Sequence, residues 1–589
     1  MRLNLFASAL LLVAGPVVGR SVAVRSEEPA LLRRAPTPGC LNDQSRLCWD
    51  GTYNIDTNYY QTGPRTGRVV EYTFDVQNIT LAPDGRSRQV LAINGQIPGP
   101  TIVANWGDTI RVTVKNSMQH NGTSIHWHGI RMLNNFKNDG VNGITECPVA
   151  PNDSKVYEFI AEQYGTTWYH SHYSAQYGDG VWGAVQINGP ATEEYEIDLG
   201  TVTLSDWFAL QTAFQKGYAA ERGGPPPSDN FLVNGTNVNV NNTAQGERFK
   251  LNFTPGKKHR VRFVNTSVDT FFRVSLDGHN MTVIQADFNP VNPYTAATVG
   301  IAIGQRYDVI IEANQDPTKN YWLRTYPQAP CSSRNTNDGS GTANAYVAYE
   351  GVSALPTSTA TPFTASCNDE AITPHVLINI DQSGFPGNDT TLNVSAPFRV
   401  NQSGSQVFRW SIGGPLDMSV DFSNPTVSIL ENNQTVPPSL NSFFIDGAGG
   451  STVYWVIQNQ GGGAHPIHLH LHDFNVIASG AGTFNPQTSP QNWVSPPRRD
   501  VAMLPGSGYL FIAFKADNPG VALMHCHIAW HVSQGLALEL IERASEIDFS
   551  AFDSGWQDTC SNWDAWYTSP LNVYGPKTDS GLRQRPGRR

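Results

Sequence analysis

The chain has few charged residues and few long apolar runs. Only 15% of its 589 residues are Asp, Glu, Lys or Arg, and the formal net charge is −11. This acidic balance argues against nucleic acid and anionic membranes as partners. Beyond the N-terminus, no segment approaches the roughly 20 apolar residues that a membrane-spanning helix needs. We therefore expect no membrane partner.

Long amphipathic helical patterns are also scarce. Short runs rich in Val, Ile, Thr and Tyr recur instead, separated by Gly, Pro, Asn and Asp, as in residues 101–116 and 258–267. This pattern predicts an all-β chain built of sandwiches. At roughly 150 residues per domain, the length predicts three or four domains. We expect sandwiches over 35–190, 191–355 and 374–543, a linker over 356–373 and a C-terminal segment over 544–582.

The N-terminus predicts export. Arg2 precedes an apolar run from Leu3 to Val18, which indicates a signal peptide over residues 1–19. The dibasic pair Arg33-Arg34 predicts a propeptide over 20–34. A secreted, extracellular glycoprotein is also consistent with the abundant Asn-x-Ser/Thr sequons, which include Asn78, Asn121, Asn241, Asn252, Asn393 and Asn433.

The seven cysteines fit an oxidising compartment. Cys526 stands between two histidines and is assigned to a metal, which leaves six cysteines. Six allow fifteen pairings, so spacing alone does not settle the connectivity. Proximity in the sequence favours Cys40–Cys48 and Cys331–Cys367, which leaves Cys147–Cys560.

The histidines carry the strongest functional signal. Four His-x-His pairs occur near the two ends of the chain: His126/His128, His170/His172, His468/His470 and His525/His527. Because side chains alternate along a strand, the two histidines of a pair point the same way and can bind neighbouring metals. The pairs come only from the first and last sandwiches, so a multinuclear site has to lie where these two pack together.

Cys526 separates the last pair and points to the opposite face. With His531 and His465 it forms a His2Cys set, the ligand type of a blue copper site. Leu536 takes the place of a weak axial ligand and cannot coordinate, which predicts a fairly high reduction potential. The two sites then lie on the order of 10 Å apart and are joined by covalent bonds, which suits electron transfer.

Four segments resemble the copper signatures of multicopper oxidases, and specifically those of ascomycete-type laccases: HWHG, WYHSHYSAQYGDGVWG, HPIHLH and HCHIAWHVSQGL. The resemblance covers nearly the whole mature chain. It implies three cupredoxin-like Greek-key β-sandwiches, four copper ions, and oxidation of phenolic substrates coupled to reduction of dioxygen to water. It implies the same three disulfides that proximity favours. We expect a monomer, and the natural phenol stays open.

The resemblance also implies roles for single residues. His465, Cys526 and His531 hold the type 1 copper, and His126 and His468 the type 2 copper. The two type 3 coppers take His128, His170 and His527, and His172, His470 and His525. Asp269 matches a substrate-pocket carboxylate that accepts the phenol proton, and Asp139 an acid near the trinuclear site. Cleavage after Leu582 would remove residues 583–589, and the new carboxylate would close a channel.

Two departures and several alternatives remain. Leu471 replaces the usual glycine of HLHGH, at a cost of roughly 1–2 kcal/mol if that position needs a positive φ. Position 529, where another laccase group has an acid, is Ala529.

We interpret His120, His259, His279 and His375 as structural. A ferroxidase or an ascorbate-type oxidase is the alternative enzyme, whereas a copper store or an electron carrier leaves the link through Cys526 unexplained.

Overall fold

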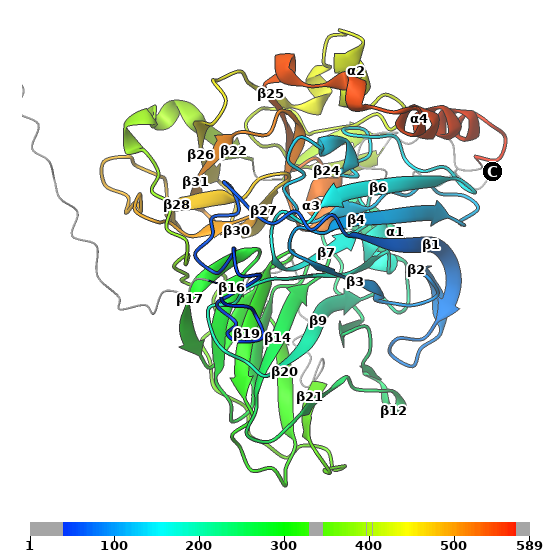
Figure 1. Ribbon diagram of the computed structural model, residues 1–589. Coiled ribbons are helices and arrows are strands. Elements are labelled where there is room, and N and C mark those ends of the chain that lie inside the picture. The colour runs from blue at the N-terminus through cyan, green and yellow to red at the C-terminus, as the bar shows by residue number, and fades with distance from the viewer. Residues whose placement is uncertain (1–38, 329–330, 332–344, 396, 403–404, 573–589) are drawn as a thin grey trace, which may run out of the picture.

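A computed structural model of the chain describes residues 39–328, 331, 345–395, 397–402 and 405–572. They form three β-sandwiches, which confirms the all-β prediction (Figure 1). The predicted signal peptide, the propeptide and the cleavage after Leu582 lie outside the described residues. No helix in the described part of the chain is long and apolar enough to cross a membrane.

Each sandwich consists of two sheets packed face to face. The strands of each sheet are given in hydrogen-bonded order. One sheet of the first sandwich has β2 (Arg88–Ile93), β1 (Val69–Leu81), β4 (Thr109–Asn116) and β6 (Ser154–Ile160). The sheet that faces it has β3 (Gly99–Asn105), β8 (Trp182–Asn188), β7 (Gly165–His170) and β5 (His126–Trp127). One sheet of the second sandwich has β10 (Asn230–Val233), β9 (Ile197–Trp207), β14 (Lys258–Asn265), β19 (Arg306–Glu312), β16 (Met281–Ala286) and β17 (Asn289–Ala296). The sheet that faces it has β13 (Lys250–Phe253), β21 (Ala345–Tyr349), β20 (Tyr321–Pro327), β15 (Phe272–Leu276) and β18 (Val299–Ile301).

The third sandwich carries the remaining histidine pairs. One of its sheets has β22 (Thr391–Val394), β26 (Ser451–Asn459), β31 (Gly508–Ala516), β28 (Phe474–Ala481) and β29 (Arg498–Arg499). The other has β25 (Ser442–Ile445), β33 (Ala537–Glu542), β32 (Gly520–Cys526), β27 (His465–Leu469) and β30 (Val501–Leu504). Two small hairpins accompany the sandwiches: β11 (Val238–Asn239) with β12 (Asn242–Gly246), and β23 (Phe398–Gln402) with β24 (Ser405–Arg409). The α-helices of the described residues are short: α1 (Ala213–Gly223), α2 (Thr426–Glu431), α3 (Ala529–Ser533) and α4 (Ser554–Tyr567).

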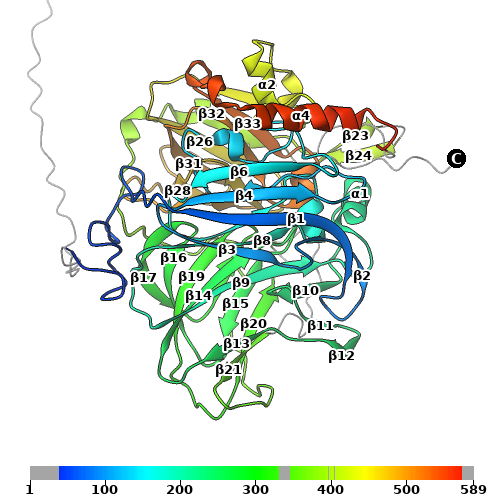
Figure 2. The same cartoon turned by 45° about the vertical axis from the view of Figure 1, so that its right-hand side comes forward.

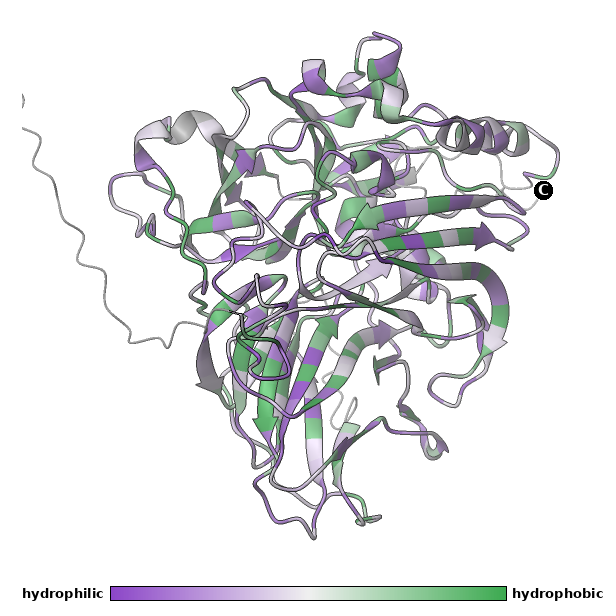
Figure 3. Ribbon diagram, in the orientation of Figure 1, coloured by the Kyte–Doolittle hydropathy of each residue, from purple (hydrophilic) through white to green (hydrophobic). Residues whose placement is uncertain are grey.

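Strand alternation explains how these sheets form. In β6 every second residue is buried, and Tyr157 and Phe159 point into the core. Lys155 also points inward, where its ammonium pairs with the buried Glu146 carboxylate, so its charge is compensated. Figure 3 shows the same alternation of hydrophilic and hydrophobic residues along β1, β4 and β6.

The first and third sandwiches share one buried core. A single cluster of buried apolar side chains includes Trp127 and Ile102 of the first and Ile467 and Leu510 of the third. The middle sandwich has a cluster of its own, built around residues such as Val261 and Val309. The packing of the two histidine-bearing sandwiches that the sequence predicts is therefore present, with the middle sandwich below them in Figure 1.

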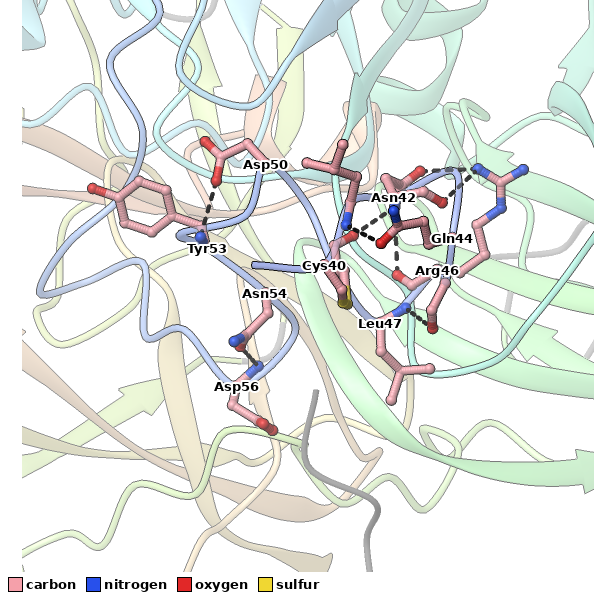
Figure 4. Close-up of a disulfide and its surroundings, with 12 residues drawn as sticks. Cys40, Asn42, Gln44, Arg46, Leu47, Asp50, Tyr53, Asn54 and Asp56 are labelled. Atoms are coloured by element: carbon pink, nitrogen blue, oxygen red, sulfur yellow. Dashed lines mark hydrogen bonds between the residues drawn. A yellow bond between two sulfur atoms is a disulfide. The ribbon is translucent and has the colours of Figure 1, made fainter. Parts of the chain in front are cut away.

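Three disulfides match the favoured pairing: Cys40–Cys48, Cys331–Cys367 and Cys147–Cys560. Figure 4 shows how the first one lies in a hydrogen-bonded loop, where the Asn42 side chain donates to the Cys48 carbonyl at 2.7 Å and accepts from Arg46 at 2.9 Å. The last one joins α4 to the first sandwich. Cys526 is the free cysteine of the described residues, and it is buried.

Candidate metal centre

The structure brings His465, Cys526 and His531 together. Cys526 ends β32, His465 begins the adjacent strand β27, and His531 lies in α3. The Cys526 Sγ atom is 3.6 Å from the Nδ1 atom of each histidine, and the two Nδ1 atoms are 3.1 Å apart. All three side chains are buried. Three donors thus face one point, and they are the donor set of a His2Cys copper site.

Burial shifts the pKa values of these three groups, and the shifts decide in which protonation state each can bind a metal. It raises the pKa of the Cys526 thiol, and it lowers the pKa of His531 and brings that of His465 to about 4. At neutral pH the imidazoles are therefore in their neutral, metal-binding form. The thiol keeps its proton until a cation replaces it, so metal binding has to release that proton.

The wall of this group is apolar. The Cys526 amide donates to the carbonyl of Leu536 at 3.1 Å, and the Leu536 side chain is fully buried. The Trp410 ring lies beside both imidazoles, with centroid distances of 4.9 Å to His465 and 4.7 Å to His531. His465, Cys526 and His531 would hold a copper ion here, and an apolar wall that adds no further donor from the described residues would favour its reduced state.

The remaining paired histidines gather on the other side of Cys526. Strand pairing sets His126 opposite His170 and His468 opposite His525. Groups of three have one donor atom each within 4.8 Å of one another: His126, His128 and His468; His128, His170 and His527; and His172, His470 and His525.

The donor chemistry of this cluster fits a bound cation. His470 Nδ1 lies 2.9 Å from an Asp139 carboxylate oxygen, and His525 Nδ1 lies 2.9 Å from the Cys526 carbonyl. Each Nδ1 therefore carries the proton, because both partners only accept. The two Nε2 atoms, 3.1 Å apart, then face each other with lone pairs. Burial lowers the pKa of both imidazoles, to about 4 for His525, so an added proton does not relieve this repulsion at neutral pH, whereas a metal ion does.

His126 and His468 show the same arrangement. Their Nδ1 atoms donate to the backbone carbonyls of Asp139 and Asp500, at 2.9 and 2.8 Å. Within the described residues, their buried Nε2 atoms have no hydrogen-bond partner. Buried polar atoms are normally satisfied, so these two point to a ligand.

Two charged residues that the sequence reasoning missed support the cluster. Asp500 accepts from His128 Nε2 at 3.1 Å, and Arg306 donates two hydrogen bonds to Asp500 at 2.6 and 2.7 Å. Both side chains are fully buried. Asp139, which was predicted, lies close to two rings, at 3.1 Å from His126 and 2.9 Å from His470. The Arg-Arg-Asp run at 498–500, charged and flanked by apolar segments, was the signal available for Asp500.

Asp269 lies in a loop that is tied to α3. The Val268 carbonyl accepts from the Ala529 amide at 2.9 Å, two residues before His531. Asp206, also missed, holds this loop: its carboxylate accepts from the amides of Val268 and Asp269 at 3.0 and 2.9 Å. Burial raises the pKa of Asp206 to about 6 despite these hydrogen bonds.

Other histidines have structural partners. His472 contacts the His470 carbonyl at 3.1 Å and the Glu542 carboxylate at 2.9 Å. His279 bridges the Asp277 carbonyl and the Tyr349 hydroxyl. Leu471 has a φ of +64°, so the condition for its conformational cost of roughly 1–2 kcal/mol is met.

Comparison with known proteins agrees with this geometry. Multicopper oxidase family models match residues 75–192, 198–352 and 391–546. Laccase-2 of Botryotinia fuckeliana is 43% identical over 95% of this chain and 96% of its own, and a laccase of Cryphonectria parasitica is 43% identical over 92% and 94%. The crystal structure of a Botrytis aclada laccase covers 91% of this chain and 98% of its own, with 42% identity and a TM-score of 0.84. Fet3p, a multicopper oxidase that functions in iron import, is more distant at 26% identity and a TM-score of 0.74, over 84% of this chain and 95% of its own.

The chain therefore belongs to the multicopper oxidase family, and its sandwiches are the three cupredoxin-like domains of that family. Within the family it groups with the laccases of ascomycete fungi. Proteins of this kind hold four copper ions, one of type 1, one of type 2 and two of type 3, and the donor sets of the two histidine groups fit them.

Proposed function

We propose that this chain is a secreted laccase that takes single electrons from phenols and reduces dioxygen to water. Copper ions held by the two groups of donors would supply one-electron acceptance at one site and multi-electron oxygen reduction at the other. The observation that carries the proposal is the placement of Cys526 between His525 and His527. The thiol faces His465 and His531, while the two flanking imidazoles lie in the opposite cluster.

The ligand assignment is the one that the family resemblance implies. His465, Cys526 and His531 would hold type 1 copper, and His126 and His468 type 2 copper through their Nε2 atoms. His128, His170 and His527 would hold one type 3 copper, and His172, His470 and His525 the other. The groups that lie within 4.8 Å of one another support this division.

Two acids have proposed roles in proton handling. Asp269 would accept the proton that a phenol loses when it is oxidised beside His531, because the Val268–Ala529 hydrogen bond ties its loop to α3. Asp139 would orient His470 and His126 and hold a proton near the oxygen site, since its carboxylate lies 2.9 and 3.1 Å from their rings.

A small cavity suits dioxygen as the second substrate. It measures about 70 Å³, reaches His172, and is otherwise lined mainly by apolar side chains such as Val141, Met418 and Leu523. Such a passage admits a small apolar gas more readily than a phenol. A phenol would instead react at the surface near His531.

We also propose how the chain is processed: it is exported, residues 1–19 and 20–34 are removed, and the C-terminus is cleaved after Leu582. We propose domain boundaries at 35–190, 191–355 and 374–543, with a linker over 356–373 and a C-terminal segment over 544–582. A monomeric state and the absence of nucleic acid or membrane partners also belong here; the net charge of −11 supports the last point.

One experiment tests the proposal. The copper-loaded protein should contain four coppers per chain and show a blue optical band with separate type 1 and type 2 spin-resonance signals. Steady-state rates with a methoxyphenol, ascorbate and Fe(II) should rank the phenol first. A preference for Fe(II) by orders of magnitude in kcat/KM would favour a ferroxidase, the alternative kept open by the likeness to Fet3p.

A further inference from the structure

Helix α1 connects all three sandwiches close to the cysteine-side group. Asp179 ties the N-terminal end of α1 to the first sandwich, because its carboxylate accepts from the Ala213 amide at 2.9 Å and from Arg88 at 3.1 Å. At the other end, Glu221 accepts from Arg409 at 2.8 Å. The next residue, Trp410, lies against the His531 ring. Figure 2 shows α1 between the ends of β1 and β2 and the hairpin of β24.

A hollow of about 580 Å³ lies beside the first turns of α1. Its volume is within the range of roughly 300–1,000 Å³ that is typical of pockets for small molecules. The wall from α1 contributes Phe214, Gln215 and Tyr218, and Tyr218 is 36% exposed. The wall from the first sandwich contributes Gln89, Asn78 and Asn121.

Asn78 and Asn121 are both the first residue of a sequon. Their sequences are Asn78-Ile-Thr and Asn121-Gly-Thr. They reach one hollow because β1 and β4 run parallel, with Val76 paired to Asn116. Asn78 lies in β1 two residues beyond this pair, and Asn121 lies in the loop that follows β4. Asn78 is exposed and Asn121 half-buried. Because two sequons line the same hollow, we expect its occupant to be covalently attached to the chain.

The lining matches the chemistry of a sugar. A pyranose ring has apolar C–H faces and a polar rim of hydroxyl and acetamido groups. The hollow offers two aromatic rings for the faces, from Phe214 and Tyr218, and amide groups for the rim, from Gln89, Gln211 and Gln215. An aromatic ring with a polar edge packs against such a partner at little cost in conformational entropy.

We propose that Asn78 and Asn121 carry N-linked glycans whose core sugars occupy this hollow and hold α1 against the first sandwich. The inference rests on the export proposed above and is independent of copper. Because α1 also positions the Arg409–Trp410 segment, the sugars would stabilise the surroundings of His531 without touching them.

The test uses the full chain secreted from a fungal host, together with Asn121→Gln, Asn78→Gln and the control Asn252→Gln, which removes an exposed sequon outside the hollow. Peptide mass spectrometry measures occupancy at each asparagine. Release by an N-glycosidase is then timed on native and on denatured protein. We expect both sites to be occupied, and native release at Asn121 to be at least about tenfold slower than denatured release.

Hydrogen exchange adds a second readout. In Asn121→Gln, the amides of residues 213–223 should exchange several-fold faster than in the parent, while Asn252→Gln should leave them unchanged. Unmodified Asn78 and Asn121, or native release as fast as denatured release, would overturn the proposal. If Asn121→Gln does not fold, the release rates and Asn78→Gln still decide it. Copper content and phenol oxidation, measured in parallel, report separately on the proposed laccase function.

Discussion

Arg306 and Asp500 form a buried, two-pronged ion pair that joins the middle sandwich to the histidine cluster. Arg306 begins β19 of the second sandwich, and Asp500 stands between β29 and β30 of the third. Arg306 Nε also donates to the carbonyl of Thr166 in the first sandwich at 3.0 Å. The side chain of Asp500 accepts a hydrogen bond from His128, and the backbone carbonyl of Asp500 accepts one from His468. By holding Asp500 through Arg306, the middle sandwich, which has no histidine pairs, helps to orient these two rings.

Arg306→Lys should weaken copper binding at the histidine cluster. Lysine keeps the charge but not the planar fork, so Asp500 loses one of the two hydrogen bonds that Arg306 donates to it and gains freedom to rotate. Mutation of groups that orient metal ligands typically costs about 10- to 100-fold in metal affinity or activity. Copper content and the type 2 spin-resonance signal measure the effect. Arg324→Lys makes the same change in a comparable two-pronged pair with Asp277 away from the cluster, so it is the matched control and should leave the copper content unchanged.

Cys526→Ser should remove the blue absorption and the phenol activity together. A serine hydroxyl is a poor copper ligand in this set, whereas the eight paired histidines are untouched, so we expect one copper fewer per chain. Optical spectra and metal analysis measure both. A variant that kept its blue colour would refute the type 1 assignment.

Asp269→Asn should lower phenol turnover most at mildly acidic pH, where free phenol gives up its proton least readily. A non-phenolic electron donor releases no proton and should be oxidised at nearly the parent rate. Steady-state kinetics on the two donors from about pH 4, the ordinary carboxyl pKa, up to about pH 7 separate these cases. Equal losses on both donors would eliminate the role as a base.

Glu539→Gln should change the pH dependence of stability. Burial raises the pKa of Glu539 from 4.5 to about 7, against hydrogen bonds such as that from Ser442 at 2.6 Å. The native chain thus holds this proton more tightly than the unfolded chain, so its stability falls as pH rises from about 4.5 to 7. The loss amounts to about 3 kcal/mol.

The glutamine variant cannot ionise and should lack this loss. Relative to the parent it should be more stable at pH 8 and no more stable at pH 4. Denaturation midpoints at the two pH values measure the difference. Parallel midpoints for both proteins would show that Glu539 does not titrate in this window.

The sequence predicted the parts of the site that are encoded by local spacing. His525, Cys526 and His527 occupy consecutive positions, so strand alternation alone separates their faces. Arg306 and Asp206 were missed because each acts through a partner far along the chain, and a single charged residue has no local pattern. Asp500 stands in a charged run, but its partners Arg306 and His128 lie far along the chain, so the run alone does not show its role. The bridging role of α1 was missed for the same reason: Asp179 and Arg409, which hold its ends, belong to other sandwiches.

The Cys147–Cys560 disulfide closes a loop between residues 413 positions apart, which spans the middle and third sandwiches. A protease that cut any surface loop inside that span would leave the two fragments covalently attached. The chain would then run as one species without reductant and as two with it. Loss of function after such a cut would report damage at the nicked loop, and not escape of one histidine-bearing half from the other.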